Sequence, residues 1–145
     1  MQLTAYTDYT LRALIYLGIR PNSEQSSIKE ISDFYNISNN HLSKVVHELG
    51  KAGLITTTRG RNGGIRLAKE PKEINVGHVV RHTESPINLV ECFDQENNTC
   101  KISPACRLKG VLYEALQAYL AVLDSYTLED MIHNRDQLKD LIIKN

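Results

Sequence analysis

The spacing of apolar residues along the chain predicts a mostly helical fold. Over residues 7–19 apolar side chains recur at helical intervals, which predicts a first helix that is capped by Thr7 and ended by the segment 20–23, where a proline lacks a backbone donor. Asp8 would lie in the first turn, where the helix dipole favours a carboxylate and an ion pair with Arg12 can form. From these residues alone, Asp8 is interpreted as a favourable surface charge.

Two short helices joined by a tight turn are expected next. Residues 27–30 (SIKE) form a capping-box pattern, in which each end residue satisfies the backbone amide of the other, and Ser38 is expected to cap a second helix that stops at Gly53. With Ile37 anchoring the turn between them, the pair is typical of a helix-turn-helix. The second helix begins with polar residues that can contact base edges in the major groove of DNA. These residues are Ser38, Asn39, Asn40, His41, Ser43 and Lys44.

A β-hairpin wing is expected after the helix-turn-helix. Residues 54–58 are a β-branched run, residues 65–67 form a second short strand, and the turn between them is rich in glycine. Glycines let the tip of such a wing approach a duplex closely, and arginines at the tip suit phosphate or a narrow minor groove. The tip residues predicted to contact DNA are Arg59, Arg61 and Asn62.

A short helix over residues 76–82 is expected after the wing, capped by Asn75. Its two histidines, His78 and His82, are four residues apart and share one face, which is the spacing of a metal-binding pair. Because the sequence around them lacks an H-E-x-x-H pattern, we interpret them as an exposed or core-edge pair.

A long helix is expected to begin at the Ser-Pro pair of residues 103–104 and to extend for about 22 residues, or about 33 Å. Its apolar residues recur at intervals of three and four, which makes a heptad seam, and further apolar residues between 111 and 123 widen the seam into a second surface. One surface can pack on its own domain while the other meets a second copy, so we predict a homodimer. The predicted dimerisation residues are Leu108, Leu112, Ala115, Tyr119, Val122 and Tyr126.

The distribution of charge favours a nucleic-acid partner. The 145-residue chain has zero formal net charge, with 17 basic and 17 acidic residues. Between Ser38 and Lys69, however, six basic residues stand against one acidic residue, Glu48, and this local excess is an electrostatic footprint for phosphate. The amino terminus lacks the basic segment of a signal peptide, and no apolar run approaches about 18 residues, so we expect a cytoplasmic protein without a membrane span.

All three cysteines lie in one polar segment, from Cys92 to Cys106, with the spacing C-x7-C-x5-C. If this segment is ordered, something other than apolar burial must order it, and three thiolates on a metal would do so. A zinc site requires a fourth ligand and usually has cysteines paired as C-x2-C, which this segment lacks. A thiol switch requires one cysteine with a lowered pKa and a second cysteine to form a disulfide with it. An iron–sulfur cluster tolerates the irregular spacing but also requires a fourth ligand. The residues alone leave these three open. No motif places a histidine or aspartate partner for a nucleophilic cysteine, so we do not expect an enzyme.

Five stretches of the chain resemble the Rrf2 family of bacterial winged-helix regulators. They are LTAYTDYTLRALIYL, ISNNHLSKVV, RGRNGGIRLA, INVGHVV and the three-cysteine segment before the long helix. The cysteine segment and long helix are most similar to the nitric-oxide-sensing repressors of that family. This resemblance implies that Cys92, Cys100 and Cys106 bind a [4Fe-4S] cluster, with Asp8 of the other subunit as fourth ligand. Family members that regulate cluster assembly have a histidine three residues after the third cysteine, where this chain has Lys109, which argues against a [2Fe-2S] centre.

These observations together predict a mostly α-helical fold with a small β-hairpin wing, that is, a winged helix-turn-helix followed by a long dimerisation helix. The expected parts are a DNA-binding domain at 1–83 and a cluster-binding loop at 84–106. Residues 104–145 would form the long helix and two C-terminal helices, beginning at Thr127 and Asn134, which pack back on the DNA-binding domain through Leu138, Leu141 and Ile142.

The predicted function is that of a homodimeric repressor on a palindromic operator in double-stranded DNA. By the resemblance, its cluster senses nitric oxide, which relieves repression of genes for nitric-oxide detoxification or nitrosative stress. The alternative is a cluster-free regulator whose cysteine thiols sense oxidants or reactive sulfur and nitrogen species. No membrane partner is expected.

Overall fold

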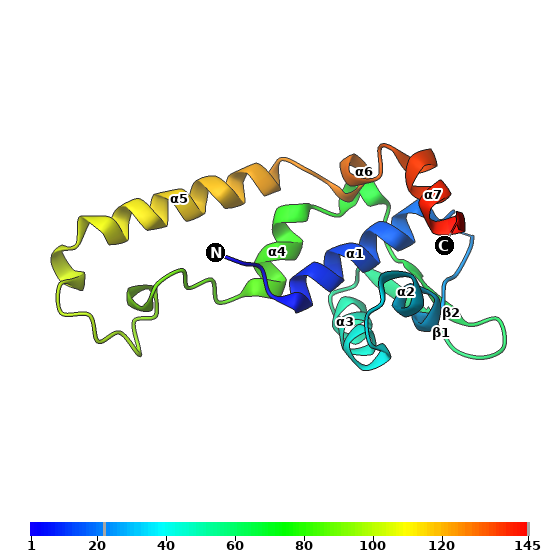
Figure 1. Ribbon diagram of the computed structural model, residues 1–145, viewed down its shortest axis with the longest axis horizontal. Helices are drawn as coiled ribbons and strands as arrows, with labels where there is room; N and C mark the ends of the chain where they lie inside the picture. The colour runs from blue at the N-terminus through cyan, green and yellow to red at the C-terminus, as the bar shows by residue number, and fades with distance from the viewer. Residues whose placement is uncertain (22, 145) are drawn as a thin grey trace.

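Helix α1 runs through the middle of the fold and contacts helices from both halves of the chain (Figure 1). The computed structural model describes residues 1–21 and 23–144. Asn22, in the segment predicted to end the first helix, and Asn145, at the predicted end of the last helix, lie outside the described residues. The elements, in chain order, are α1 (Ala5–Ile19), α2 (Ile28–Tyr35), α3 (Asn39–Lys51), β1 (Ile55–Thr58), β2 (Gly64–Leu67), η1 (Pro71–Glu73), α4 (Val76–Glu84), η2 (Glu91–Phe93), η3 (Ser103–Ala105), α5 (Arg107–Asp124), α6 (Leu128–Met131) and α7 (Arg135–Lys144).

The cap of helix α1 lies three residues earlier than predicted. Thr4 is the N-cap, because its hydroxyl accepts a hydrogen bond from the Thr7 amide at 3.3 Å, and the Thr7 side chain is buried within the first turn. The Thr7 hydroxyl donates at 2.5 Å to the carboxylate of Glu84, the last residue of α4, which also accepts from the Thr4 amide at 2.7 Å. The prediction of a Thr7 cap is therefore wrong, because the partner that fixes this end of α1 is distant in the sequence.

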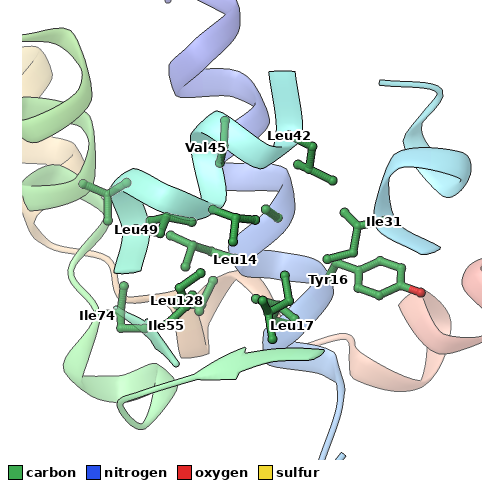
Figure 2. Close-up of a cluster of buried hydrophobic side chains, with 14 of the residues drawn as sticks. Leu14, Tyr16, Leu17, Ile31, Leu42, Val45, Leu49, Ile55, Ile74 and Leu128 are labelled. Carbon is green, nitrogen blue, oxygen red and sulfur yellow. The ribbon is translucent and has the colours of Figure 1, made fainter. Parts of the chain in front are cut away.

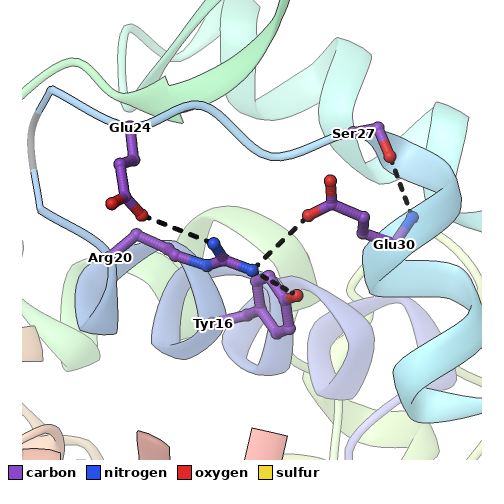
Figure 3. A network of polar contacts seen from close by, with 5 residues as sticks. All are labelled: Tyr16, Arg20, Glu24, Ser27 and Glu30. Atoms are coloured by element: carbon purple, nitrogen blue, oxygen red, sulfur yellow. Dashed lines mark hydrogen bonds and ion pairs between the residues drawn. The ribbon is translucent and has the colours of Figure 1, made fainter. Parts of the chain in front are cut away.

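Only half of the predicted capping box forms at the start of α2. The Ser27 hydroxyl accepts from the Glu30 amide at 3.0 Å, but the Glu30 carboxylate turns to the Arg20 guanidinium, at 3.5 Å (Figure 3). Arg20 also contacts the Glu24 carboxylate at 3.4 Å and the Tyr16 hydroxyl at 3.1 Å. An exposed ion pair of this kind contributes less than about 1 kcal/mol. The network nevertheless connects the end of α1, the loop that follows it and the start of α2.

The main core lies between α1, α2, α3, the wing and α6 (Figure 2). Leu14 of α1, Ile31 of α2 and Leu42 of α3 are almost completely buried there, because helical spacing places each on the inward face of its helix. Leu128 of α6 is buried in the same cluster, so the chain returns to its amino-terminal part after the long helix. The stripe predicted on α3 is buried throughout: Leu42, Val45, Val46 and Leu49.

The wing has three backbone segments rather than two. Strands β1 and β2 pair antiparallel as predicted, with Ile55 opposite Leu67. Ser26, in the loop before α2, forms a further bridge with Ile65: the Ser26 amide donates to the Ile65 carbonyl at 3.0 Å, and the Ile65 amide donates to the Ser26 carbonyl at 2.8 Å. The base of the wing is therefore bonded to the segment that leads into the helix-turn-helix.

Helix α5 and the segment between α4 and α5 project from the core as an arm (Figure 1). Leu116 and Leu120 of α5 pack against Val80 of α4 in a second, smaller core. Helix α5 begins later than predicted, because residues 103–105 form the separate turn η3 and Cys106 takes the N-cap position. With 18 residues, α5 is about 27 Å long.

The end of α5 approaches α4 so closely that a glycine is required. A Cβ added at Gly77 would lie 2.8 Å from the backbone nitrogen of Asp124, which is closer than real Cβ contacts. The Asn75 side-chain amide donates to the Asp124 carbonyl at 2.7 Å, and the Arg81 guanidinium pairs with the Asp124 carboxylate. The hydrogen bond from Arg81 holds the pKa of Asp124 below its ordinary value. These contacts fix the base of the arm.

Helices α6 and α7 return to α1. Thr127 caps α6, with its amide donating to the Asp130 carboxylate at 2.8 Å. Ile142 of α7 packs against the main core, as predicted, whereas Leu141 is 56% exposed, so the prediction that Leu141 packs back is wrong. Among the described residues, no helix has both the length and the apolar character needed to cross a membrane.

Candidate nucleic-acid interface and cysteine segment

The first turn of α3 presents the polar residues predicted to meet DNA. The Ser38 hydroxyl accepts a hydrogen bond from the His41 amide at 3.2 Å and so caps the helix. Ser38 therefore fixes the start of α3 in addition to any contact that it makes with DNA. The other residues of the set are all exposed: Asn39, Asn40, His41, Ser43 and Lys44.

His41 lies against α1. The centroid of its ring is 6.2 Å from that of Tyr9, with the ring planes tilted by 33°. This separation is within the range of favourable aromatic pairs. Because Tyr9 and His41 are far apart in the chain, no local pattern in the sequence could have indicated the contact.

The tip of the wing exposes the predicted residues Arg59, Arg61 and Asn62. Its turn depends on glycine, since Gly60 has a φ of 103° and a Cβ added at Gly63 would lie 2.8 Å from the Gly60 carbonyl oxygen. Within the described part of the chain, neither arginine of the tip forms an ion pair. Their charges are therefore available to a phosphate backbone.

The cysteine segment is ordered by its own polar side chains. The Glu91 carboxylate accepts from the Thr99 amide at 2.6 Å and from the Thr99 hydroxyl at 2.5 Å, and these bonds lower the pKa of Glu91. The Asp94 carboxylate accepts from the Asn97 side chain at 2.7 Å. The ring of Phe93 lies 6.3 Å from that of Tyr113 on α5. Order that we assigned to a metal is thus supplied in part by hydrogen bonds and an aromatic contact.

The three cysteines are unpaired thiols, each half-buried. Cys92 lies in η2, Cys100 in the loop that follows, and Cys106 at the N-cap of α5. Among the described residues, no three His, Cys, Asp or Glu side chains lie close enough together to hold a metal ion. A zinc ion on these cysteines would need such a group, with Zn–S distances of about 2.3 Å.

An iron–sulfur cluster places a looser demand on the same residues. Each thiolate binds its own iron, so the sulfurs need not converge on one atom. Three free, half-buried thiols from one segment are therefore the type of donor that a cluster takes, with one position left for another ligand. Within its own chain Asp8 does not join the cysteines in a metal-binding group, and its carboxylate pairs instead with Arg12 at 2.7 Å.

The seam predicted for dimerisation leaves large apolar side chains in solvent. Leu108 is 61% exposed and Val122 is 60% exposed, whereas Leu116 and Leu120 face α4. Leu112 and Tyr119 are half-buried, and Tyr126 lies just beyond the end of α5. Val111, which the sequence assigned to the second apolar surface of the helix, is 58% exposed, as is Tyr113, which was assigned to neither surface.

Lys109 lies beside the cysteine segment. It lines, together with Cys92, a pocket of about 650 Å³ between that segment and α5. Lys109 therefore lies near the first cysteine. It occupies the position at which the cluster-assembly regulators of the family have a histidine.

The chain matches known proteins over nearly its whole length. The Rrf2 model, described as an iron-dependent transcriptional regulator, matches residues 3–134. The HTH-type transcriptional regulator NsrR of Shouchella clausii (strain KSM-K16) is 62% identical over 142 residues, which cover 98% of this chain and 95% of that protein. Among solved structures, CymR (YrzC), the global cysteine regulator of B. subtilis, is 28% identical with a TM-score of 0.68, covering 92% of this chain and 98% of CymR. IscR of T. potens is 27% identical with a TM-score of 0.74, covering 92% and 88%.

Proposed function

Because this chain belongs to the Rrf2 family and is a DNA-binding transcriptional repressor, we propose that its signal is nitric oxide, read through an iron–sulfur cluster on Cys92, Cys100 and Cys106. The observation that carries the proposal is the placement of three unpaired thiols in one ordered segment between α4 and α5. That segment leaves the DNA-binding part at one end and enters the predicted dimerisation helix at the other. A change within it would act on both.

DNA binding follows from α3 and the wing. Asn39, Asn40 and Ser43 are exposed at the start of α3 and would enter the major groove, where asparagine can bond adenine at two positions. Arg59 and Arg61 would contact the minor groove and backbone. In a symmetric dimer the operator would be a palindrome, with half-sites one helical turn or a multiple apart.

Dimerisation would bury the exposed seam of α5. Leu108 and Val122, near the two ends of that helix, are well exposed in the single chain. Apolar residues spaced along one helix face favour antiparallel or parallel pairing with the same face of a second copy. A second copy would also bring its own Asp8 to the cysteines, which we propose as the fourth ligand.

The cluster type that suits these residues is [4Fe-4S], with three thiolates and one oxygen donor. When bound, it would supply iron that nitric oxide can attack. For Asp8 to serve, its carboxylate must leave Arg12 of its own chain, an exposed ion pair that costs less than about 1 kcal/mol to break.

The coupling to DNA would run through Glu84. This residue precedes the cysteine segment, and its carboxylate accepts from the amide and the hydroxyl of Thr4 at 2.7 and 2.8 Å. Thr4 caps α1, and α1 packs on α3. A displacement of the cysteine segment would thus reach the reading helix through α1.

The deciding experiment is purification without oxygen, followed by measurement of iron and labile sulfide per subunit. We expect a coloured protein that shifts a promoter fragment, loses that shift on exposure to nitric oxide, and loses both colour and response when all three cysteines are changed to serine. A triple variant that keeps its nitric-oxide response would refute the proposal.

A second candidate is a cluster-free regulator that senses oxidants through its thiols. It is favoured by the free, half-buried state of the three cysteines, with no metal-binding group among the described residues. This candidate predicts a colourless protein, fully active on DNA, that is released by thiol oxidants and restored by reductant.

A further inference from the structure

A groove lies between α1, α3 and α4, and none of the roles above uses it as a site, although His41 and Lys44 of its lining are among the predicted DNA-contacting residues. Its volume is about 560 Å³, and its apolar lining residues are Ala5 and Val45. The polar residues that line it come from three helices. They are Tyr6 and Tyr9 of α1, His41, Lys44 and Glu48 of α3, and His82 of α4.

The groove is rich in side chains that can donate hydrogen bonds, and one of them, Lys44, carries a positive charge. Among the described residues, Lys44, His41 and His82 form no ion pair. The single carboxylate in the lining, that of Glu48, already contacts the Lys51 ammonium at 3.4 Å. Burial and the Glu48 charge raise the pKa of Tyr6, so its hydroxyl is a neutral donor. Lysine, histidine and tyrosine side chains together suit an oxyanion.

The position of the groove indicates which oxyanion. A recognition helix in a major groove about 12 Å wide has a sugar–phosphate strand along each of its sides. The wing projects from the end of the DNA-binding part that lies away from the first turn of α1 (Figure 1). The groove lies at that first turn, beside α3, at the opposite end of the DNA-binding part from the wing.

We infer that this groove binds a backbone phosphate of the DNA strand that the wing does not contact, so that each protomer holds the duplex on both sides of α3. The inference rests on the proposed insertion of α3 into the major groove. It changes the role of two predicted base readers, because Lys44 and His41 then position the protein without reading sequence. It also gives His82 a role that its spacing from His78 did not suggest.

The test compares variants for binding to two DNA probes, a mixed-sequence duplex and an operator duplex that the protein itself selects from a random pool. His82→Gln and Tyr9→Phe should each weaken both probes by the same factor, about 3- to 10-fold, as expected for one lost hydrogen bond of typical net strength. Lys44→Gln should weaken both and should lower the slope of log affinity against log salt by about 1 per protomer.

The matched control is His78→Gln, since His78 is exposed on the same helix but does not line the groove. It should bind both probes as the unaltered protein does. Thermal unfolding of each variant confirms that the fold is kept, which is expected because His82 is exposed.

Two results would overturn the inference: His82→Gln binding like His78→Gln, or losses confined to the selected operator, which would mean that the groove supports base reading. If the unaltered protein binds neither probe, the proposed function itself fails. If it binds both, and Arg59→Ala weakens binding while the groove variants do not, only the phosphate site fails.

Discussion

The carboxylate of Glu84, at the end of α4, accepts a hydrogen bond from the amide of Thr4, at the start of α1, over 2.7 Å. The helix that carries Asp8 and the helix that precedes the cysteines are thereby joined at one point. Glu84 also accepts from the hydroxyls of Thr4 and Thr7.

The first prediction concerns acid stability. Burial raises the pKa of Glu84, but the hydrogen bonds from Thr7 and Thr4 outweigh it, so the pKa lies below its ordinary value. A carboxylate whose pKa is lowered on folding stabilises the fold above its unfolded pKa, about 4.3, and this contribution is lost as the pH falls below that value. We expect Glu84→Gln to lower stability by about 1 kcal/mol at pH 7, and by progressively less as the pH falls from about 4.3 through the lower pKa of the folded state. Thermal unfolding across pH checks this, with Glu114→Gln on the exposed side of α5 as control.

The second prediction concerns the junction of α4 and α5. Gly77→Ala places a Cβ against the backbone of Asp124 and should cost about 1–3 kcal/mol in the free energy of unfolding. Gly110→Ala, at an exposed position in the first turn of α5, meets nothing within 4 Å and should instead stabilise by about 0.5–1 kcal/mol. Urea unfolding of both variants measures the difference. Equal effects of the two substitutions would show that the close approach at Gly77 is not made.

The third prediction concerns the wing. Arg59→Ala should weaken binding to specific and random duplexes alike, and should reduce the salt dependence of log affinity by about 1 per protomer, if the tip contacts phosphate. Arg107→Ala, at the far end of the arm, removes the same charge without touching the wing and should leave both unchanged. A loss limited to the specific duplex would assign Arg59 to base reading.

The fourth prediction separates ligation from surface charge at Asp8. Asp8→Ala and Asp33→Ala each remove an exposed i,i+4 ion pair, with Arg12 at 2.7 Å and with Lys29 at 2.6 Å, and each should change stability by less than about 1 kcal/mol. Only Asp8→Ala should alter the visible spectrum of the anaerobic protein and its reaction with nitric oxide. If the two spectra are the same, Asp8 is not a ligand.

The patterns that predicted the helix-turn-helix and the wing are local, and they gave the right elements. The stripe of α3, its Ser38 cap and the pairing of β1 with β2 depend on neighbouring residues, so spacing alone was sufficient. The cap of α1 was misplaced because Glu84 decides it from another helix. The predicted capping box is incomplete because the Glu30 carboxylate pairs with the Arg20 guanidinium instead.

The residues of the candidate site also fall into those that local patterns predict and those that depend on distant contacts. The exposed residues of α3 and the wing tip could be chosen from type and position in the sequence. The contact of His41 with Tyr9, and the groove that His82 shares with them, required three helices to be placed in space. The proposed fourth ligand of the cysteine site, Asp8, would come from a second copy of the chain, and the pattern of a single sequence indicates such a ligand only through resemblance.

The bridge between Ser26 and Ile65 has a mechanical consequence. Because the Ser26–Ile65 bridge bonds the hairpin to the strand-like entry of α2, it restrains the hairpin from moving independently of the helix-turn-helix. In the proposed dimer, each DNA-binding part would then meet its half-site as one stiff body, and a signal would act by altering the separation or relative tilt of the two. A small rotation at the base of the arm would then break the DNA contacts of α3 and of the wing together, so dissociation from the operator would be abrupt rather than graded.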